Sequence, residues 1–244
     1  MTSRPGPPVA AGTARRPAVT SDYRPNRVRG PLNALFFGVL DGYLDRLLRP
    51  YKRRVFADLP ATVVELGPGV GANLRYLAPG TRLIAIEPNR AMHSRLRTRA
   101  ARARVDLDLH DAVGDRLDLP DASVDAVISS LVLCTVPDPA AVVAEVRRVL
   151  RPGGRFAFVE HVAAAEGTLL RRLQRVVRRP WGWAFEGCSC ERDLRAVVEA
   201  AGFADTTITD HRLRSPFLPA NTQIAGVATT RIRDVPAPER CARR

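Results

Sequence analysis

Lysine, aromatic residues and long apolar runs are all scarce in this sequence. Lys52 is the one lysine among 38 basic residues, so the net charge of +13 comes almost entirely from arginine. A charge of this size would ordinarily suggest a nucleic acid or an anionic membrane as partner. We interpret it instead as a compositional bias on a solvated surface, with a functional basic face as the alternative.

Aromatic residues make up 6% of the chain and are absent from its densest group of arginines. That group consists of Arg95, Arg97, Arg99, Arg102 and Arg104. Single-stranded nucleic acids are usually held by aromatic stacking along a basic groove, so the missing aromatics disfavour nucleic-acid binding. An RNA-binding or RNA-modifying protein is kept only as an alternative from another functional class.

No run of about 18 apolar residues occurs, so we expect no membrane-spanning helix, while peripheral contact with a membrane stays open. Residues 1–25 contain much Pro, Ala and Arg and lack the central apolar stretch of a secretion signal. We predict a disordered tail there and a second flexible tail at 233–244. We expect a cytoplasmic protein that is a monomer or a weak homodimer.

Cysteine is also sparse. The four cysteines are Cys134, Cys188, Cys190 and Cys241. They form no C-x-x-C pair, so we predict no zinc site and assign no residue to metal binding. Cys188 and Cys190 are one residue apart, which disfavours a disulfide between them, and a reducing compartment is the simplest setting.

Short apolar strands alternate with helical stretches over most of the chain, which predicts a parallel sheet with helices on both faces. We expect strands at residues 62–66, 82–86, 105–109, 124–129 and 155–159. We expect helices at residues 32–57, 72–77, 90–101 and 139–150. Pro50 should kink or divide the first helix, Asn89 should cap the third, and residues 151–154 (Arg-Pro-Gly-Gly) should stop the fourth.

The last third of the chain has a different pattern. Helices at 168–179 and 191–201 should flank an irregular segment that contains Trp181 and Trp183, and strands at 203–211 and 222–230 suit an antiparallel edge. We predict a single domain over residues 26–232. Its parts are a helical cap (26–58), a cofactor-binding core (60–162), a substrate cover (163–201) and closing strands (202–232).

The segment 65–71 (Glu-Leu-Gly-Pro-Gly-Val-Gly) lies between the first predicted strand and a predicted helix. Glycines there let the backbone approach a ligand closely, and the helix N-terminus would favour a carboxylate or a pyrophosphate. Dinucleotide-binding loops have the spacing G-x-G-x-x-G, whereas this loop reads G-x-G-x-G with an acid two residues ahead. The departure favours S-adenosylmethionine over NAD, so a nicotinamide-dependent reductase is the weaker alternative.

Glu87 ends the second predicted strand, 16 residues after Gly71. Ligands of doubly wound sheets bind at the carboxyl ends of the strands, where this carboxylate can accept hydrogen bonds from both ribose hydroxyls. Met92, about one helical turn later, either lies against an adenine face or packs in the core. Residues 110–117 follow the third strand at the same edge of the sheet, and backbone and side-chain groups there are predicted to bind the adenine amino group.

Taken in order, these motifs resemble class I S-adenosylmethionine-dependent methyltransferases, in the subgroup that includes the ubiquinone and menaquinone biosynthesis methyltransferases. The matching segments are 65–71, 87–89, 119–125 and 147–154. A more specific resemblance, to the methyltransferase-like family of animal alkyl thiol methyltransferases, reaches to about residue 190. It rests on segments 71–73, 87–89, 123–125, 131–136, 149–154, 160–164 and 185–188.

The resemblance implies an α/β fold with a Rossmann-like, doubly wound, seven-stranded sheet, mostly parallel with an antiparallel last strand. It also implies S-adenosylmethionine as cofactor and a small-molecule acceptor. The predicted cofactor-binding residues are Glu65, Gly67, Pro68, Gly69, Gly71, Glu87, Pro88, Asn89, Met92, Val113, Gly114, Ser130 and Leu131. Pro68 and Val70 depart from residues that are common in the family. The hydrophobic anchor of the animal relatives is not matched by the polar, Pro-rich N-terminus.

The resemblance favours methyl transfer to a thiol, whose thiolate is the nucleophile. The alternative is O-, N- or C-methylation of a quinone, lipid or natural-product acceptor by the same fold. His161, at the end of the fifth strand, is the predicted general base or thiolate stabiliser, with a purely structural histidine as the alternative.

Cys134 either faces the cleft or fills the core. Trp181, Trp183 and Phe185 either line an acceptor pocket or form the core of the cover.

Overall fold

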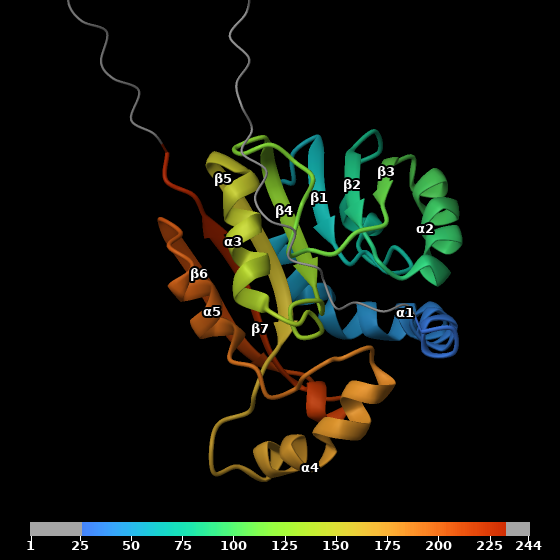
Figure 1. The fold of residues 1–244 in the computed structure, drawn as a ribbon, viewed down its shortest axis with the longest axis vertical. Helices are drawn as coiled ribbons and strands as arrows, with labels where there is room; N and C mark the ends of the chain where they lie inside the picture. The colour runs from blue at the N-terminus through green and yellow to red at the C-terminus, as the bar shows by residue number, and fades with distance from the viewer. Residues whose placement is uncertain (1–25, 233–244) are drawn as a thin grey trace, which may run out of the picture.

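A seven-stranded sheet runs through the centre of the molecule, in the strand order β3-β2-β1-β4-β5-β7-β6 (Figure 1). The computed structural model describes residues 26–232, so the tails expected at 1–25 and 233–244 lie outside the described residues. The strands are β1 (Thr62–Leu66), β2 (Arg82–Ile86), β3 (Asp106–His110), β4 (Val124–Ser130), β5 (Leu150–His161), β6 (Asp205–Arg212) and β7 (Thr222–Thr229). Strands β1 to β5 pair in parallel, and β7 runs antiparallel between β5 and β6. The predicted α/β sheet, mostly parallel with a reversed last strand, is confirmed.

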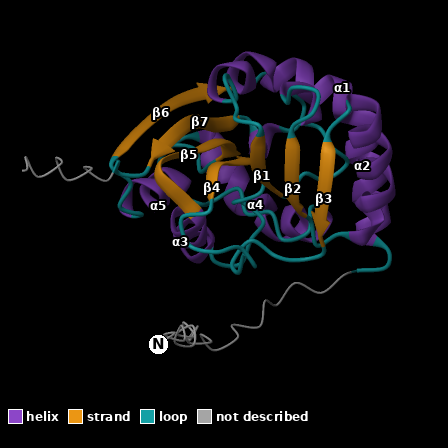
Figure 2. Cartoon of the chain, turned by 90° about the horizontal axis from the view of Figure 1, so that it is seen from above, coloured by secondary structure: helices purple, strands orange, loops and turns teal. Residues whose placement is uncertain are grey.

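Helices cover both faces of this sheet, as a doubly wound fold requires (Figure 2). The helices are α1 (Arg29–Val55), α2 (Arg90–Ala103), α3 (Pro139–Val149), α4 (Leu169–Ala184) and α5 (Leu194–Ala200), with the 3₁₀ turns η1 (Leu74–Tyr76) and η2 (Leu218–Ala220). Val63 of β1 packs with Leu96 of α2 in the core on one face, and Val64 packs with Val143 of α3 in the core on the other. Both faces of β1 are therefore buried, which explains why its sequence (Thr-Val-Val-Glu-Leu) does not alternate between apolar and polar residues.

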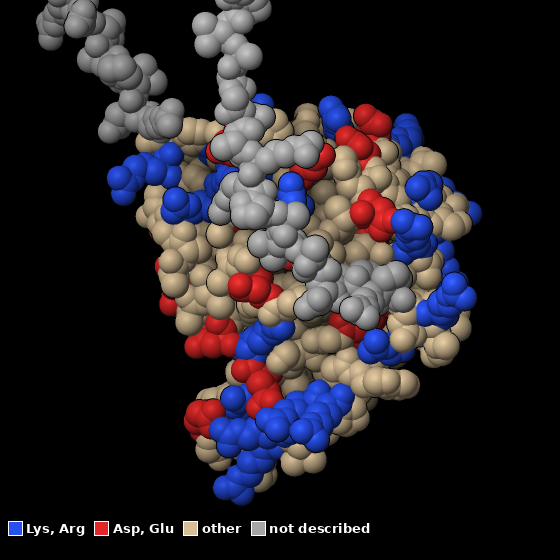
Figure 3. Space-filling model, in the orientation of Figure 1, with Lys and Arg blue, Asp and Glu red and all other residues tan. Residues whose placement is uncertain are grey.

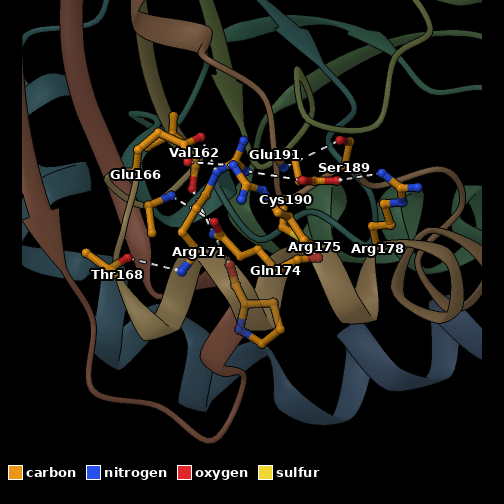
Figure 4. Close-up of polar contacts among 12 residues, drawn as sticks. Val162, Glu166, Thr168, Arg171, Gln174, Arg175, Arg178, Ser189, Cys190 and Glu191 are labelled. Atoms are coloured by element: carbon orange, nitrogen blue, oxygen red, sulfur yellow. Dashed lines mark hydrogen bonds and ion pairs between the residues drawn. The ribbon is translucent and has the colours of Figure 1, made fainter.

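Helix α4 lies beyond the carboxyl ends of the strands rather than on either face of the sheet (Figure 1). Its buried Gln174 donates from Nε2 to the carbonyl oxygens of Val162 and Pro219, at 3.2 and 2.9 Å. Arginines of the same helix pair with Glu166 and Glu191 on either side of Gln174 (Figure 4). These contacts hold α4 across the end of β5.

The predicted helices differ from the structure at three places. The helix expected at 72–77 is only the 3₁₀ turn η1, since Pro79 soon follows and the Asn73 side chain is engaged in tertiary contacts. Pro50 was predicted to kink or divide the first helix; it lies inside α1, which continues to Val55, so the division is wrong. Packing of α1 on α2 and the sheet compensates for the hydrogen bond that proline cannot make.

The segment around Trp181 is helical rather than irregular, because α4 continues to Ala184.

Helix and strand ends were predicted more closely. Asn89 caps α2 as expected, since its Oδ1 accepts a hydrogen bond from Ala91 N at 3.1 Å. Residues 151–154 do follow the end of α3, but they belong to β5, which begins at Leu150 and shifts its register against β4 between Val124 and Ala126. Within residues 26–232, no helix has the length and apolar character needed to cross a membrane.

Candidate active site

A cavity of about 290 Å³ lies at the carboxyl ends of β1, β2, β4 and β5. The turns after these strands form one side of it, and α1 and the end of α4 contribute Phe36, Trp181 and Phe185 to the other. Ligands of doubly wound sheets bind at this edge. A mainly apolar cavity with a few convergent polar groups is typical of a small-molecule site.

The cavity brings together most of the residues that were predicted to bind the cofactor or act in catalysis. Its wall includes Gly67, Pro68, Gly69, Glu87, Pro88, Asn89, Met92, Val113, Gly114, Ser130, Leu131 and His161. Glu65 and Gly71 lie behind this wall. Glu65 is fully buried, and Gly71 N donates to Pro68 O at 2.9 Å inside the turn. Gly71 therefore shapes the site through the turn that it closes.

Two glycines determine the shape of the loop after β1. Gly67 and Gly69 have φ angles of +52° and +58°, in the left-handed region that favours glycine. A Cβ atom on Gly67 would lie 2.6 Å from Cγ2 of Val132, which is also in the cavity wall. The loop thus presents bare backbone where a side chain would not fit.

Glu87 joins this loop to the turn after β2. Its Oε2 accepts a hydrogen bond from Gly69 N and its Oε1 accepts one from Asn89 N, both at 2.8 Å. Burial raises the pKa of Glu87 to about 7, although the two N–H donors act in the opposite direction. Each carboxylate oxygen keeps a further lone pair, so Glu87 can also accept hydrogen bonds from a ligand in the cavity.

A buried polar chain, which sequence reasoning missed, lies behind the glycine loop. Lys52 Nζ donates to Asn73 Oδ1 and Asn73 Nδ2 donates to Glu65 Oε1, both at 2.7 Å. Burial lowers the pKa of Lys52 to about 8 and raises that of Glu65 to about 7. The second oxygen of Glu65 has no hydrogen-bond partner among the described residues. The composition could have pointed to these hydrogen-bonded residues, because Lys52 is the one lysine of an arginine-rich sequence.

A sulfur-containing group forms another part of the wall. Cys134 follows β4, His161 ends β5 and Cys188 follows α4, and all three line the cavity. His161 Nε2 lies 2.8 Å from Cys188 Sγ, and Cys134 Sγ lies 3.7 Å from the same sulfur. Trp181 Nε1 donates a hydrogen bond to Cys188 Sγ at 3.2 Å. Cys188, which had no predicted role, is therefore the centre of this group.

The electrostatics of this group favour an ionised Cys188. The hydrogen bond with Cys134 and the charge of His161 lower the pKa of Cys188 despite its burial, whereas burial raises the pKa of the Cys134 thiol. Burial disfavours the His161 imidazolium, but the neighbouring Cys188 thiolate and Glu160 act in the opposite direction, and the pKa of His161 is raised overall. A protonated imidazole is a hydrogen-bond donor, and the sulfur that His161 contacts here is Cys188 Sγ.

Aromatic side chains of α1 and α4 meet over the cavity. Phe36 packs edge-on against Phe185 and Phe217, with ring centroids 5.5 and 5.7 Å apart, and Trp181 lies 4.4 Å from Phe185. Trp181 and Phe185 line the cavity, as one of the two sequence interpretations held. Trp183 is 66% exposed and is not part of the wall.

The arginines that were considered as a basic face are partly engaged within the molecule. Arg95 donates to Ala34 O at 2.8 Å and Arg99 pairs with Asp41 at 3.0 Å, so both hold α2 against α1. Exposed arginines gather instead over α4 (Figure 3). They are Arg172, Arg175, Arg178 and Arg179.

The residues present fit the parts of S-adenosylmethionine. The bare glycine loop allows close approach, the Glu87 carboxylate suits a diol, and the unpartnered Glu65 oxygen beside Lys52 suits a ligand that carries both an ammonium and a carboxylate. A reversed last strand, this loop and an acid at the end of β2 together define a class I S-adenosylmethionine-dependent methyltransferase.

Comparison with known proteins agrees with this class. A family model described as a methyltransferase domain matches residues 64–158. The chain is 34% identical over 189 residues to the thiol S-methyltransferase TMT1B of Rattus norvegicus, covering 72% of this chain and 77% of that protein. It is 36% identical over 165 residues to the thiol S-methyltransferase TMT1A of Homo sapiens, covering 63% of this chain and 67% of that protein.

A solved structure shows the same fold. It is a methyltransferase of Thermotoga maritima, described as an S-adenosylmethionine-dependent enzyme and possible histamine N-methyltransferase. The TM-score is 0.59 at 16% identity, covering 83% of this chain and 98% of that one. With the curated relatives, these matches show that the chain belongs to the methyltransferase family that contains TMT1A and TMT1B.

Proposed function

We propose that this methyltransferase transfers the methyl group of S-adenosylmethionine to the sulfur of a small, apolar thiol. The observation that carries the proposal is the group formed by Cys134, His161 and Cys188 in the cavity wall. Two sulfur atoms and an imidazole form a soft, polarisable environment in which an acceptor sulfur is accommodated better than a hard oxygen. Similarity to proteins named thiol S-methyltransferases supports the same acceptor, because it covers 72% of the chain.

When bound, the cofactor supplies an electrophilic methyl group on a sulfonium. In the proposed arrangement Glu87 accepts hydrogen bonds from the ribose hydroxyls, and Met92 and residues 113–114 border the adenine. Lys52 pairs with the methionine carboxylate, and the free oxygen of Glu65 lies near the ammonium group. The lining of the cavity and the buried chain behind the glycine loop support these roles.

The acceptor occupies the part of the cavity bordered by Phe36, Trp181 and Phe185. These rings exclude water and orient the thiol, which is the main requirement of an in-line displacement. His161 contacts the Cys188 sulfur at 2.8 Å and so keeps a polarised sulfur and imidazole beside the acceptor, whose thiolate is the reactive form. Helix α1 acts as the predicted cap and α4 as the predicted cover, since both supply cavity residues.

We also infer the setting in which this reaction takes place. Cys134, Cys188 and Cys190 are free thiols, which supports a cytoplasmic protein.

A monomer or weak homodimer remains the prediction, to be checked by light scattering. Exposed arginines gather over α4 (Figure 3), and Val176 and Trp183 of the same helix are also exposed, which supports peripheral contact with an anionic membrane. Sedimentation with anionic vesicles tests this contact.

The proposal is tested by giving the purified chain methyl-labelled S-adenosylmethionine and a panel of acceptors. The panel contains small alkyl thiols, hydrogen sulfide, quinols, phenols and RNA. Label in thioethers or methanethiol is the expected result. Label on quinols or phenols without thiol turnover would overturn the thiol acceptor and leave the methyltransferase assignment intact. Salt-sensitive retention of RNA together with label on RNA would favour the alternative class.

A further inference from the structure

Three metal-ligating side chains from three separate elements meet in the cavity wall. The thiols of Cys134 and Cys188 and the imidazole of His161 have ligand atoms that all lie within 4.8 Å of one another. Each residue is at most 6% exposed, and each lines the cavity. His161 and Cys188 are 27 positions apart in the chain, so local spacing did not reveal the group.

The separations in this group suit a tetrahedral cation site. A zinc–sulfur bond of about 2.3 Å implies a sulfur–sulfur edge of about 3.8 Å, and the two Sγ atoms lie 3.7 Å apart. The Nε2–Sγ distance of 2.8 Å would widen by several tenths of an ångström around an ion. A small rotation of the imidazole is enough, because Cys188 reaches it from a loop outside the sheet.

The surroundings of the two sulfurs also resemble a prepared metal site. Trp181 Nε1 donates to Cys188 Sγ at 3.2 Å, which is the kind of outer contact that orients a thiolate ligand. Ser189 N donates to Cys134 O at 2.8 Å and so ties the two cysteine-bearing loops together. Two thiolates would neutralise a divalent cation, so the site would carry no net charge within an apolar wall.

We propose that Cys134, His161 and Cys188 bind a thiophilic divalent cation, with Zn²⁺ as the best match, and that its fourth position opens into the cavity. Two cysteines, one histidine and one open position form a recognised donor set of catalytic zinc sites. The inference departs from the expectation of no metal, which rested on the missing C-x-x-C pair.

The role of the cation rests on the proposed thiol acceptor. The acceptor thiol binds at the open position and releases its proton to solvent, which leaves a metal-bound thiolate. That sulfur forms a bond to the methyl carbon as the carbon–sulfonium bond breaks, and the electron pair of the broken bond stays on the cofactor sulfur. The products are a thioether and S-adenosylhomocysteine. The neutral thioether is a weaker ligand than a thiolate and leaves the site.

The test begins with binding to the full-length, reduced protein. Zn²⁺ binding is measured by equilibrium dialysis with elemental analysis, and Co²⁺ is added as a spectroscopic probe. We expect a stoichiometry of one Zn²⁺ per chain and, with Co²⁺, a thiolate-to-metal charge-transfer band with the strong visible absorption of tetrahedral cobalt. Absence of both signals in the wild-type protein would overturn the site, whatever the variants do.

Variants then identify the ligands. Cys134→Ser and Cys188→Ser should each weaken Zn²⁺ binding by about 100-fold or more and remove the cobalt charge-transfer intensity. Cys190→Ser is the matched control, since its sulfur is buried but contacts Gln174 O rather than the group. Equal Zn²⁺ affinity in all three variants would contradict the assignment. Circular dichroism and cofactor binding verify that each variant is folded.

Activity separates this inference from the proposed function. Chelator-treated protein, shown by elemental analysis to be metal-free, should lose thiol methylation and regain it with Zn²⁺. Full thiol turnover by metal-free protein would overturn the catalytic cation and leave S-methylation standing. Metal binding without any thiol turnover would leave the site standing and overturn the thiol acceptor.

Discussion

His161 Nε2 lies 2.8 Å from Cys188 Sγ, and both residues line the cavity at the carboxyl ends of the strands. The histidine arrives from the end of β5 and the cysteine from the loop after α4. Their contact therefore depends on α4 lying across the end of β5, where the buried Gln174 holds it. A substitution in α4 that disturbs this position should for this reason lower the rate of methyl transfer as well as the free energy of unfolding.

Replacing His161 should affect catalysis more than cofactor binding. His161→Gln removes the imidazole nitrogen that contacts Cys188 Sγ, and we expect a fall in kcat for a thiol acceptor of roughly 10²- to 10⁴-fold. The Kd for S-adenosylmethionine should stay nearly unchanged. Stopped assays with a saturating thiol and calorimetric titration of the cofactor measure the two effects. His110→Gln, half-exposed on β3 and outside the cavity wall, is the control.

Replacing Glu87 should affect cofactor binding first. Glu87→Gln weakens the carboxylate's hydrogen bonds with Gly69 N and Asn89 N and with the ribose in the proposed arrangement. Hydrogen bonds to charged groups contribute about 1.5–3 kcal/mol each, so the Kd for S-adenosylmethionine should rise by about 10-fold or more. Calorimetry of the variant beside the exposed Glu199→Gln checks this, and an unchanged Kd would contradict the proposed role.

Cofactor binding should strengthen as pH rises through about 7. The pKa values of Glu65 and Glu87 are both raised to about 7 by burial, and a carboxylate binds the hydroxyl and ammonium groups of the cofactor better than a carboxylic acid. Calorimetric titrations from pH 5.5 to 7.5, below the lowered pKa of Lys52, should show the Kd falling across this window. Glu87→Gln and Glu65→Gln should each remove part of the pH dependence of this Kd. A Kd that does not change with pH in the wild type would contradict the prediction.

Stability without cofactor should have the opposite pH dependence. In the folded state these two acids hold their protons up to about pH 7, while in the unfolded chain they lose them near pH 4.5. Their contribution is therefore present below pH 4.5 and is lost as pH rises through about 7. The loss amounts to at most about 3 kcal/mol for each group, and urea unfolding of the wild type and of Glu65→Gln measures it.

Gly67 and Gly80 form a matched pair for testing the glycine loop. Both have positive φ angles, but only at Gly67 would a Cβ atom meet another side chain, at 2.6 Å from Val132. Gly80→Ala should cost about 1 kcal/mol of backbone strain and leave cofactor binding intact. Gly67→Ala should cost about 3 kcal/mol and abolish binding. Thermal unfolding and cofactor titration of both variants compare them, and similar behaviour would contradict the role of the loop.

The sheet could be predicted from the sequence because its signals are local. Short, mainly apolar segments predicted β1 and β2 at their observed bounds, and Asn89 predicted the start of α2. The glycine loop and Glu87 follow neighbouring parallel strands, so their meeting at one edge followed from the fold class. The short turn η1 was missed because Asn73 is committed to Lys52 and Glu65 by tertiary contacts.

The acceptor side could be predicted only in part. His161 was found because it ends a strand at the ligand edge, but Cys188 was not, because its position depends on the path of α4. Helix α4 itself continues through the Trp-containing segment to Ala184, whereas the predicted helix ended at residue 179. Lys52 was interpreted as one charge among many, whereas burial against Asn73 makes it part of the site.

The identity of the acceptor atom is the central claim, and a competition between three matched acceptors tests it most directly. Benzyl mercaptan, benzyl alcohol and benzylamine share one ring and differ in the atom that would receive the methyl group. The purified protein is given S-adenosylmethionine and all three together, and the products are identified by mass spectrometry. We predict that the methyl group appears on sulfur, as the methyl thioether, and not on oxygen or nitrogen. Formation of the methyl ether or the N-methylamine without the thioether would contradict the account.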